Sequence, residues 1–432
     1  MRTRYTGGLV WDGGSGCLAP LDICTEDGTV VGRGSAPRGY SPDRTVDLSG
    51  LAVFPGFADV HVHLREPGFS YKETIASGSR ACARGGYTDV CAMPNLDPVP
   101  DSPGHLAAEE ALIARDAVIN VHPYGAITRG QRGEGELVDM AALAPRVCGF
   151  SDDGRGVKEA ETMRQAMLRC READSILSAH CEDVRLIPAG AGIHDGRYAR
   201  LHDLPGIPSE SEYGPVLRDI ALCRETGCRY HVCHVSTKEA VDAIRAAKAE
   251  GADITCETAP HYLLLCEDDL PDEPDAPRAG WFKMNPPLRS KADQDALLEG
   301  LLDGTIDCIA TDHAPHSEAE KAKGLTGSAM GISGIEIAFP LLYTHLTEIG
   351  LIPLDILMDR LCVRPRRRFR LPGGLEPGDR LALTAFDLHV RERVEPDRFL
   401  SGGKATPFAG WPLHAACRLT VTGERFAWNG LC

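Results

Sequence analysis

The stretch DVHVHLREPG, residues 59 to 68, contains two histidines two positions apart. In a β-strand, side chains alternate between faces, so Asp59, His61, His63 and Arg65 share one face and the branched apolar residues share the other. Two imidazoles on one face can direct nitrogens at a single ion, and histidine with carboxylate suits zinc or a related divalent metal. Taken alone, an HxH pair is more typical of hydrogen-bonded histidines, so a metal site needs further ligands.

Further candidate ligands follow other apolar runs. SAHCED, CHVST and ATDHAPH contain His180, His234 and Asp312, each just after a strand-like segment. FSDDG adds Asp152 and Asp153, although DDG is also an ordinary turn sequence and strand alternation does not choose between the two aspartates. Five such positions would not gather at strand ends by chance, so the pattern predicts a metal site.

Eight strand-like runs, separated by segments with helical character, position these residues. They cover residues 57–63, 87–93, 118–124, 146–150, 175–180, 229–234, 253–258 and 306–311. The connecting segments have helix-end signals as well. In STKEAVDAIRAAKAEG, for example, Ser236 and Glu239 predict a capping box and Gly251 predicts the helix end.

Alternating strands and helices fit both a closed parallel barrel and an open doubly wound sheet. A barrel enzyme gathers its site at the carboxyl ends of nearly all strands, whereas an open sheet uses a switch point. The polar candidates end most of the runs: His63, Asn95, Asp153, His180, His234 and Asp312. We therefore predict an α/β fold, a (β/α)8 TIM-like barrel.

The two ends of the chain differ from the middle. Residues 1–53 and 376–432 contain short β-like runs and many Gly and Pro turns. We expect them to form the N-terminal and C-terminal parts of one small β domain that flanks a metal-dependent barrel at 54–375.

Composition narrows the function class. The chain of 432 residues has 62 acidic residues against 46 Lys plus Arg, a formal charge of -16, which disfavours nucleic-acid and anionic-membrane surfaces. Neither a signal-peptide pattern nor a spanning run of about 18 apolar residues is found, so we expect a cytoplasmic protein. The 16 cysteines form no CxxC pair and are interpreted as reduced, mostly buried thiols.

Several motifs together resemble a known family. HVHLREPG, MPN, FSDDG, AHCED, CHVST, KMNPPLR, ATDHAPH and TPFAGW occur in the order typical of the long, barrel-type dihydroorotases of the amidohydrolase superfamily. The resemblance covers most of the chain. It implies a hydrolase with two Zn2+ ions per subunit that interconverts N-carbamoyl-L-aspartate and L-dihydroorotate in de novo pyrimidine (UMP) biosynthesis.

The resemblance also implies residue roles. One zinc ion would be held by His61, His63 and Asp312, the other by His180 and His234, with Asp153 and a hydroxide bridging them. Asp312 would be the catalytic proton shuttle. His231 lies on the other strand face and is assigned a structural role, and Lys158 is not assigned as the carboxylated lysine that bridges the metals in many relatives.

Substrate contacts are implied in the same way, and Arg65 suits a planar carboxylate because its guanidinium donates two parallel hydrogen bonds. The implied substrate-binding residues are His63, Arg65, Asn95, Asn285, His316, Met330 and Gly331. Met330 stands where relatives commonly have Phe. Arg289 is left out because it fits a surface cation.

Two alternatives remain open at this point. One is another cyclic amidase, a hydantoinase or allantoinase, and the other is a catalytically silent scaffold subunit that resembles dihydroorotase. The expected partner is the small-molecule substrate. A homodimer and an assembly with aspartate carbamoyltransferase both stay open, because the family includes independent and assembled members.

Overall fold

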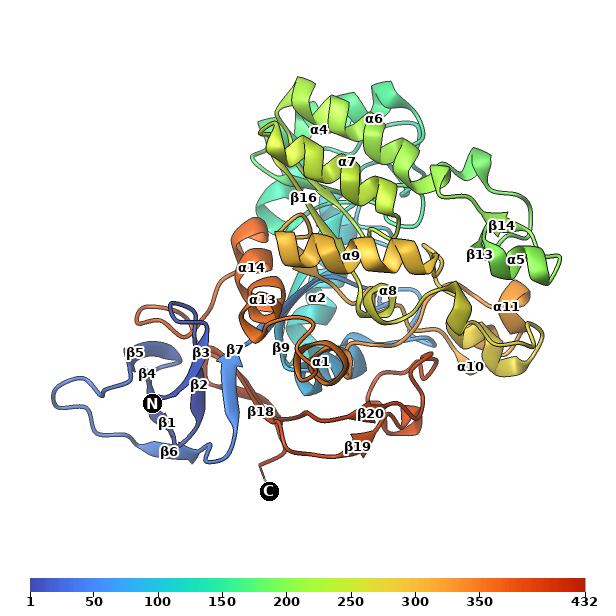
Figure 1. Ribbon diagram of the computed structural model, residues 1–432. Helices are drawn as coiled ribbons and strands as arrows, with labels where there is room; N and C mark the ends of the chain where they lie inside the picture. Colours follow the sequence, from blue (N-terminus) through green and yellow to red (C-terminus); the bar gives the residue numbers. More distant parts are fainter. Residues whose placement is uncertain (432) are drawn as a thin grey trace.

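The computed structural model describes residues 1–431 and contains a parallel barrel beside a smaller β region (Figure 1). Each of the eight predicted runs overlaps one barrel strand. The strands are β8 (Phe57–Val62), β9 (Tyr87–Ala92), β10 (Asn120–Gly125), β11 (Gly149–Phe150), β12 (Ile176–Ala179), β15 (Arg229–Val232), β16 (Ile254–Thr258) and β17 (Cys308–Ile309).

The barrel strands pair in chain order, and every neighbour is parallel. Closure occurs just beyond the last strand, where Val62 forms a parallel bridge with His313. There the His63 amide donates to the His313 carbonyl at 2.9 Å. The predicted barrel is therefore confirmed, and the open sheet is excluded because its two edges meet.

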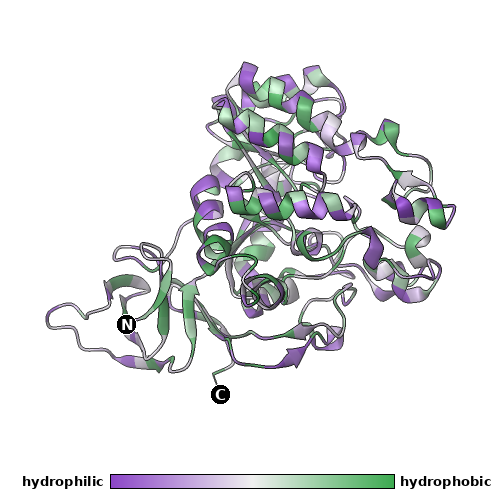
Figure 2. Cartoon of the chain, in the orientation of Figure 1, coloured by the Kyte–Doolittle hydropathy of each residue, from purple (hydrophilic) through white to green (hydrophobic). Residues whose placement is uncertain are grey.

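Helices cover the barrel, and their amphipathic sequences explain why. The longer ones are α1 (Ile75–Arg84), α2 (Pro103–Asp116), α4 (Ala160–Glu172), α6 (Glu210–Thr226), α7 (Lys238–Ala249) and α9 (Lys291–Asp303). Hydrophilic and hydrophobic residues alternate along α4, α7 and α9 (Figure 2), as expected for helices with one face on the core. Shorter helices are α3 (Met140–Leu143), α5 (Arg197–Leu201), α8 (Pro260–Leu264), α10 (Glu318–Lys321), α11 (Gly324–Gly327), α12 (Ala338–Leu342), α13 (Leu354–Met358) and α14 (Arg364–Phe369).

The predicted capping box of α7 is wrong by one residue. Thr237 is the N-cap, and its hydroxyl accepts from the Ala240 amide at 3.4 Å. Ser236 is unavailable because its hydroxyl donates to the buried Glu212 carboxylate and already accepts from Arg289 Nε at 3.1 Å. A tertiary contact that the local sequence does not reveal therefore moves the helix start.

Both chain ends contribute to the β region, where N-terminal and C-terminal strands lie side by side (Figure 1). A four-stranded sheet has the order β5 (Thr29–Arg33), β4 (Ile23–Glu26), β1 (Arg2–Thr6), β6 (Arg44–Asp47). A six-stranded sheet has the order β22 (Arg425–Asn429), β21 (Ala416–Thr422), β18 (Ala382–Asp387), β7 (Ala52–Pro55), β2 (Leu9–Asp12), β3 (Cys17–Pro20). Short pairs are formed by β13 (Ile193–His194) with β14 (Gly206–Ile207) and by β19 (Glu392–Arg393) with β20 (Pro412–Leu413). The domain limits at residues 53 and 376 stay a prediction.

A cluster of aromatic rings packs the β region against the barrel. Phe54 of β7, Phe57 of β8, Phe339 of α12 and Phe386 of β18 are fully buried. Phe339 lies 4.4 Å from Phe386, 5.1 Å from Phe57 and 5.5 Å from Phe54, measured between ring centroids. These rings belong to the same apolar core as the barrel, so the two parts share packing.

Two further features concern the whole described chain. All fifteen cysteines between residues 1 and 431 are free, and most are buried, as the sequence indicates. Within that range, no helix combines the length and the apolar character that crossing a membrane requires.

We predict that Phe386→Ala lowers the free energy of unfolding by about 3–5 kcal/mol, because it leaves a cavity among three other rings. Leu351→Ala, at a half-exposed position, is the control and should change it by about 0.5 kcal/mol or less. Urea unfolding followed by tryptophan fluorescence measures both. Equal stability of the two variants would show that the cluster does not couple the β region to the barrel.

Candidate metal and substrate site

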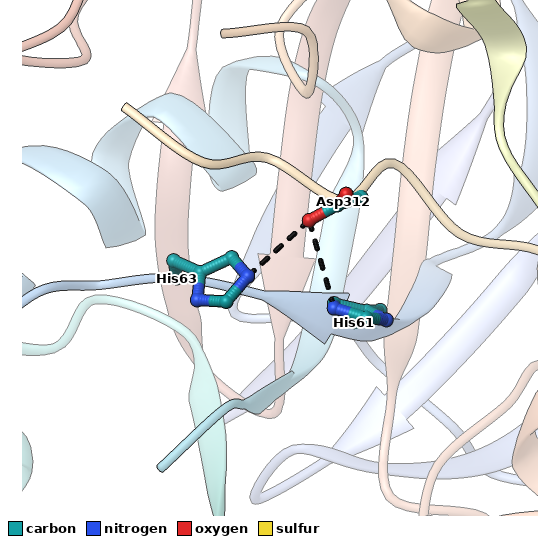
Figure 3. Close-up of side chains that lie close together, drawn as sticks. All are labelled: His61, His63 and Asp312. Atoms are coloured by element: carbon teal, nitrogen blue, oxygen red, sulfur yellow. Dashed lines mark ion pairs between the residues drawn. The ribbon is translucent and has the colours of Figure 1, made fainter. Parts of the chain in front are cut away.

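Three buried side chains converge where β8 and the segment after β17 meet (Figure 3). The Asp312 carboxylate oxygen Oδ1 lies 3.2 Å from His63 Nε2 and 3.5 Å from His61 Nε2. One ligand atom from each residue lies within 4.8 Å of the other two. The HxH pair of β8 and Asp312 can therefore hold one ion between them.

Asp153, which follows β11, lies at the centre of four imidazoles. Its Oδ1 is 3.4 Å from His61 Nε2, 3.6 Å from His180 Nδ1 and 3.5 Å from His234 Nε2, and its Oδ2 is 3.5 Å from His63 Nε2. These separations are too long for good hydrogen bonds and leave room for a bound ion. The six predicted metal ligands are thus brought together, with Asp153 in the central position.

The donor set fits a metal because some of its atoms lack any other partner. His61 Nε2 and Asp153 Oδ1 are buried and form no hydrogen bond. An unpaired buried polar atom costs free energy, and a cation would satisfy both atoms at once. Buried imidazole and carboxylate groups of this kind are consistent with a metal site.

The structure separates the two aspartates that the sequence leaves equivalent. The Asp152 carboxylate accepts from the Ile127 amide at 2.8 Å and from the Thr128 and Gly133 amides at 3.2 Å. These bonds hold the loop that follows β10. Asp152 is therefore occupied by backbone groups, and Asp153 alone faces the histidines.

Backbone geometry directs three of the site residues. Arg65, His234 and Asp312 have φ values of 60°, 36° and 46°, in the left-handed region that non-glycine residues rarely adopt. All three follow the carboxyl end of a barrel strand. The strained turn sends each side chain across the barrel mouth, and strain of this kind is concentrated at functional sites.

The sequence analysis missed Glu257, a buried carboxylate on β16. Its Oε1 accepts from His61 Nδ1 at 2.7 Å and its Oε2 lies 3.0 Å from His231 Nε2. A proton on His61 Nδ1 leaves Nε2 with its lone pair toward the site, as a metal ligand requires. The available signal was a single charged residue in a strand that is otherwise uncharged. His231 contacts this carboxylate and not Asp153.

Charge dominates the protonation of the cluster. Burial would lower the pKa of His61, but the carboxylates of Asp153 and Asp312 outweigh it and raise that pKa well above its ordinary value. Burial would also lower the pKa of His180, but the neighbouring carboxylates of Asp153 and Glu182 outweigh it and raise that pKa to about 10. Burial would raise the pKa of Asp312, yet the neighbouring histidines lower it to about 2. The negative potential of the carboxylates, which raises the pKa of these imidazoles, would also favour a metal cation at the same place.

A cavity of about 220 Å³ opens beside the cluster. All seven predicted substrate contacts line it: His63, Arg65, Asn95, Asn285, His316, Met330 and Gly331. The predicted metal ligands Asp153, His180, His234 and Asp312 line it as well. The volume suits one small molecule in direct contact with the metal site.

Arg65 lines this cavity and is a buried cation. Only 9% of the residue is exposed, and its Nε donates to the Pro315 carbonyl at 3.2 Å. Among residues 1–431 no carboxylate forms an ion pair with it. Burial lowers its pKa, although the more distant acidic groups act in the opposite direction. A buried guanidinium without a counter-ion is costly, and a ligand carboxylate would compensate it.

The two asparagines are held differently. Asn95 Nδ2 donates to the Asp153 carbonyl at 2.9 Å, while its buried Oδ1 has no partner. Asn285 Nδ2 donates to Glu182 at 2.8 Å, and Glu182 also contacts His180 Nε2 at 3.3 Å. Glu182, within the AHCED motif, is a second carboxylate that the sequence analysis missed.

The expectation for Arg289 is wrong. Arg289 is only 3% exposed and lies 3.4 Å from Glu212, so it is a buried structural cation and not a surface one. The Gly- and Ser-rich segment 317–334 contains the short helices α10 and α11. Its Met330 carbonyl accepts from His316 Nε2 at 2.8 Å, which turns this loop toward the cavity.

Two solved hydantoinase structures share this fold. L-Hydantoinase (dihydropyrimidinase) from Arthrobacter aurescens superposes with a TM-score of 0.86 over 99% of this chain and 96% of its own, at 23% identity. A D-hydantoinase from Thermus sp. superposes with a TM-score of 0.84 over 99% of this chain and 95% of its own, at 22% identity. At these identities the likeness describes the fold alone.

Sequence relatives are more specific. Residues 50–240 match the family model described as Dihydro-orotase-like. The dihydroorotase of Geobacillus sp. (strain WCH70) is 48% identical over 96% of both chains, and that of Shouchella clausii is 48% identical over 98% of this chain and 97% of its own. The chain belongs to the dihydroorotase family.

The first prediction from the site concerns Glu257. Glu257→Gln places an amide against His61 Nδ1 and allows the wrong tautomer, so zinc affinity should fall about 10- to 100-fold. Glu250→Gln, at an exposed position, is the control. Competition with a chromophoric chelator measures both. Equal affinity in the two variants would remove Glu257 as the residue that orients His61.

A second prediction concerns protons. Since the pKa of His180 is raised to about 10 and that of His61 is also raised, both imidazoles are protonated near pH 7 in the metal-free protein. Zinc needs neutral imidazoles, so binding should release on the order of two protons, and apparent affinity should rise with pH up to about pH 10. Calorimetric titration with zinc in buffers of different ionisation enthalpy measures the release. Zinc uptake without proton release would contradict this description of the cluster.

Proposed function

We propose that this chain is a zinc-dependent dihydroorotase that reversibly cyclises N-carbamoyl-L-aspartate to L-dihydroorotate, a step of de novo pyrimidine (UMP) biosynthesis. Family membership supports the reaction class. The observation that carries the substrate assignment is the buried Arg65 guanidinium, which lacks a counter-ion and borders the metal cluster. Both proposed substrates carry a carboxylate that such a guanidinium binds.

The proposed metal centre has two Zn2+ ions per subunit. His61, His63 and Asp312 would hold one ion, His180 and His234 the other, with Asp153 and a hydroxide between them. The central place of Asp153, within 3.6 Å of four imidazoles, supports this division. When bound, the two ions supply hydroxide at neutral pH and polarise the carbonyl that is attacked.

Asp312 is the proposed proton carrier. Its pKa of about 2 keeps the carboxylate ionised at rest, because the charges of the neighbouring histidines outweigh the effect of burial. In ring opening, Asp312 takes up a proton and returns it to the departing ring nitrogen. In cyclisation, it removes a proton from the attacking ureido nitrogen.

The remaining contacts orient the substrate. Arg65 and His316 would bind the carboxylate, Asn95 and Asn285 would bind the ring amide groups, and backbone groups of Met330 and Gly331 would close the pocket. The unpartnered Asn95 Oδ1 supports a ligand donor at that point. Binding of the carboxylate beside the metal cluster would hold the reacting amide in one orientation, which lowers the entropic part of the activation free energy.

Two alternatives are tested by one experiment. A hydantoinase or allantoinase would share the fold but would not require the buried carboxylate receptor, and a silent scaffold would lack metal ligands. All six ligand positions are filled in this chain. We expect two zinc ions per chain by metal analysis and turnover of L-dihydroorotate in preference to hydantoin and allantoin. A metal-free or inactive chain would contradict the proposal.

Assembly and location are part of the proposal. We infer a cytoplasmic enzyme on the basis of the family resemblance, which leaves an independent chain, a homodimer and an assembly with aspartate carbamoyltransferase open. Sedimentation velocity of the chain, alone and mixed with that enzyme, measures both associations.

We predict that Arg65→Lys keeps both metals but lowers kcat/KM for L-dihydroorotate about 30-fold, roughly 2 kcal/mol, because lysine lacks the planar fork. The carboxylate-free substrate 5,6-dihydrouracil should be poor for the wild type and should lose little more in the variant. Metal content of each preparation is the control. An equal fractional loss on both substrates would show that Arg65 does not bind the carboxylate.

A further inference from the structure

His316 lies between two cations at the rim of the cavity. Its Nδ1 is 3.2 Å from Lys72 Nζ, and its Nε2 is 3.3 Å from Arg65 Nη2. Its Nε2 also lies 2.8 Å from the Met330 carbonyl. Lys72 belongs to the segment between β8 and α1 and is not among the residues that line the cavity.

These contacts determine where the His316 ring proton lies. Burial and the charges of Arg65 and Lys72 lower the pKa of His316 to about 3, so the ring is neutral and has one proton. A lysine ammonium only donates, so the nitrogen that faces Lys72 must accept. The proton is therefore on Nε2, where it is donated to the Met330 carbonyl.

The tautomer decides whether Arg65 is free. With the proton on Nε2, Arg65 and His316 present two donors 3.3 Å apart that cannot bond to one another. An incoming carboxylate can accept from Arg65, and it can replace the Met330 carbonyl as the acceptor of the His316 Nε2–H. With the proton on Nδ1, Nε2 would have a lone pair, and Arg65 would donate to it instead of to a ligand.

We propose that Lys72 is a positioning residue for the carboxylate receptor: it holds His316 in the Nε2–H tautomer and so keeps Arg65 available for the substrate. This inference rests on the proposed function for the identity of the substrate. Lys72 acts through His316 and touches no reacting atom.

Lys72 is itself held from both sides. Its Nζ lies 2.9 Å from Glu320 Oε1 on α10, and it lies within 6 Å of the rings of Phe69 and Tyr71. The Ser317 hydroxyl donates to the same Glu320 carboxylate at 2.8 Å. Lys72 thereby also ties the segment 317–334, with Met330 in it, to the start of the barrel.

The test uses the zinc-loaded enzyme with 15N-labelled histidine. Lys72→Met removes the donor at nearly constant shape, Lys72→Arg retains a donor, and Glu320→Gln removes the loop tie but retains the Lys72 donor. Long-range 1H–15N spectra, assigned with His316→Gln, report which ring nitrogen has the proton. We expect Nε2–H in the wild type, Lys72→Arg and Glu320→Gln, and a shift toward Nδ1–H in Lys72→Met.

Kinetics provide a second readout. In Lys72→Met, the KM for L-dihydroorotate should rise about tenfold with kcat changed less than about threefold, because binding of the carboxylate is weakened while the chemistry is retained. Lys72→Arg should recover most of the loss, and the loss on 5,6-dihydrouracil should be smaller. An unchanged Nε2–H signal in Lys72→Met, or an equal rise of KM in Glu320→Gln, would overturn the proposal.

The two proposals can fail separately. Absence of dihydroorotate turnover in the zinc-loaded wild type would overturn the proposed function. The tautomer comparison between the wild type and Lys72→Met decides the role of Lys72 whatever the substrate is.

Discussion

The structure depends on the Asp153 carboxylate among four imidazoles. A buried carboxylate would be costly alone, and so would each buried histidine, yet together they balance one another and hold a cavity open for cations. The ends of four strands, β8, β11, β12 and β15, bring groups distant in sequence within 3.6 Å of one carboxylate. The closed barrel makes this possible because every carboxyl end opens on the same mouth.

The remaining polar groups fall into two sets around this centre. Glu257 and Glu182 lie behind the histidines and fix their tautomers by accepting hydrogen bonds. Arg65 and Lys72 lie on either side of the neutral His316 ring and supply positive charge at the rim of the cavity. Negative charge beneath the proposed metal ions and positive charge at the rim make the site polar along one axis, and a small anion would enter along it.

Much of this could be predicted from the sequence because it is periodic or local. The eight strands were found from alternation, and the metal candidates from their places at strand ends. The flanking strands were found from turn residues. What the sequence could not determine depends on tertiary contacts. Backbone amides bind the Asp152 carboxylate and leave Asp153 free. Ser236 bonds to the buried Glu212, and the N-cap of α7 is Thr237 instead.

Long-range charge contacts were hidden for the same reason. The sequence predicts Arg289 as a surface cation, yet it is buried and forms an ion pair with the buried Glu212. Lys72 and His316 are separated by 244 positions, and neither motif alone indicates the contact between them. The left-handed turns at Arg65, His234 and Asp312 occur without glycine, so no residue type signals them.

The six-stranded sheet constrains the order in which the chain can fold during synthesis. β18 lies between β7 and β21, so the edge of β7 remains unpaired until residues 382–387 have left the ribosome. β7 precedes β8, the first barrel strand. The rings of Phe54 and Phe57 lack their contact with Phe386 until that residue has been synthesised. A nascent chain with a nearly complete barrel therefore still exposes an apolar edge, and its last residues protect it from aggregation.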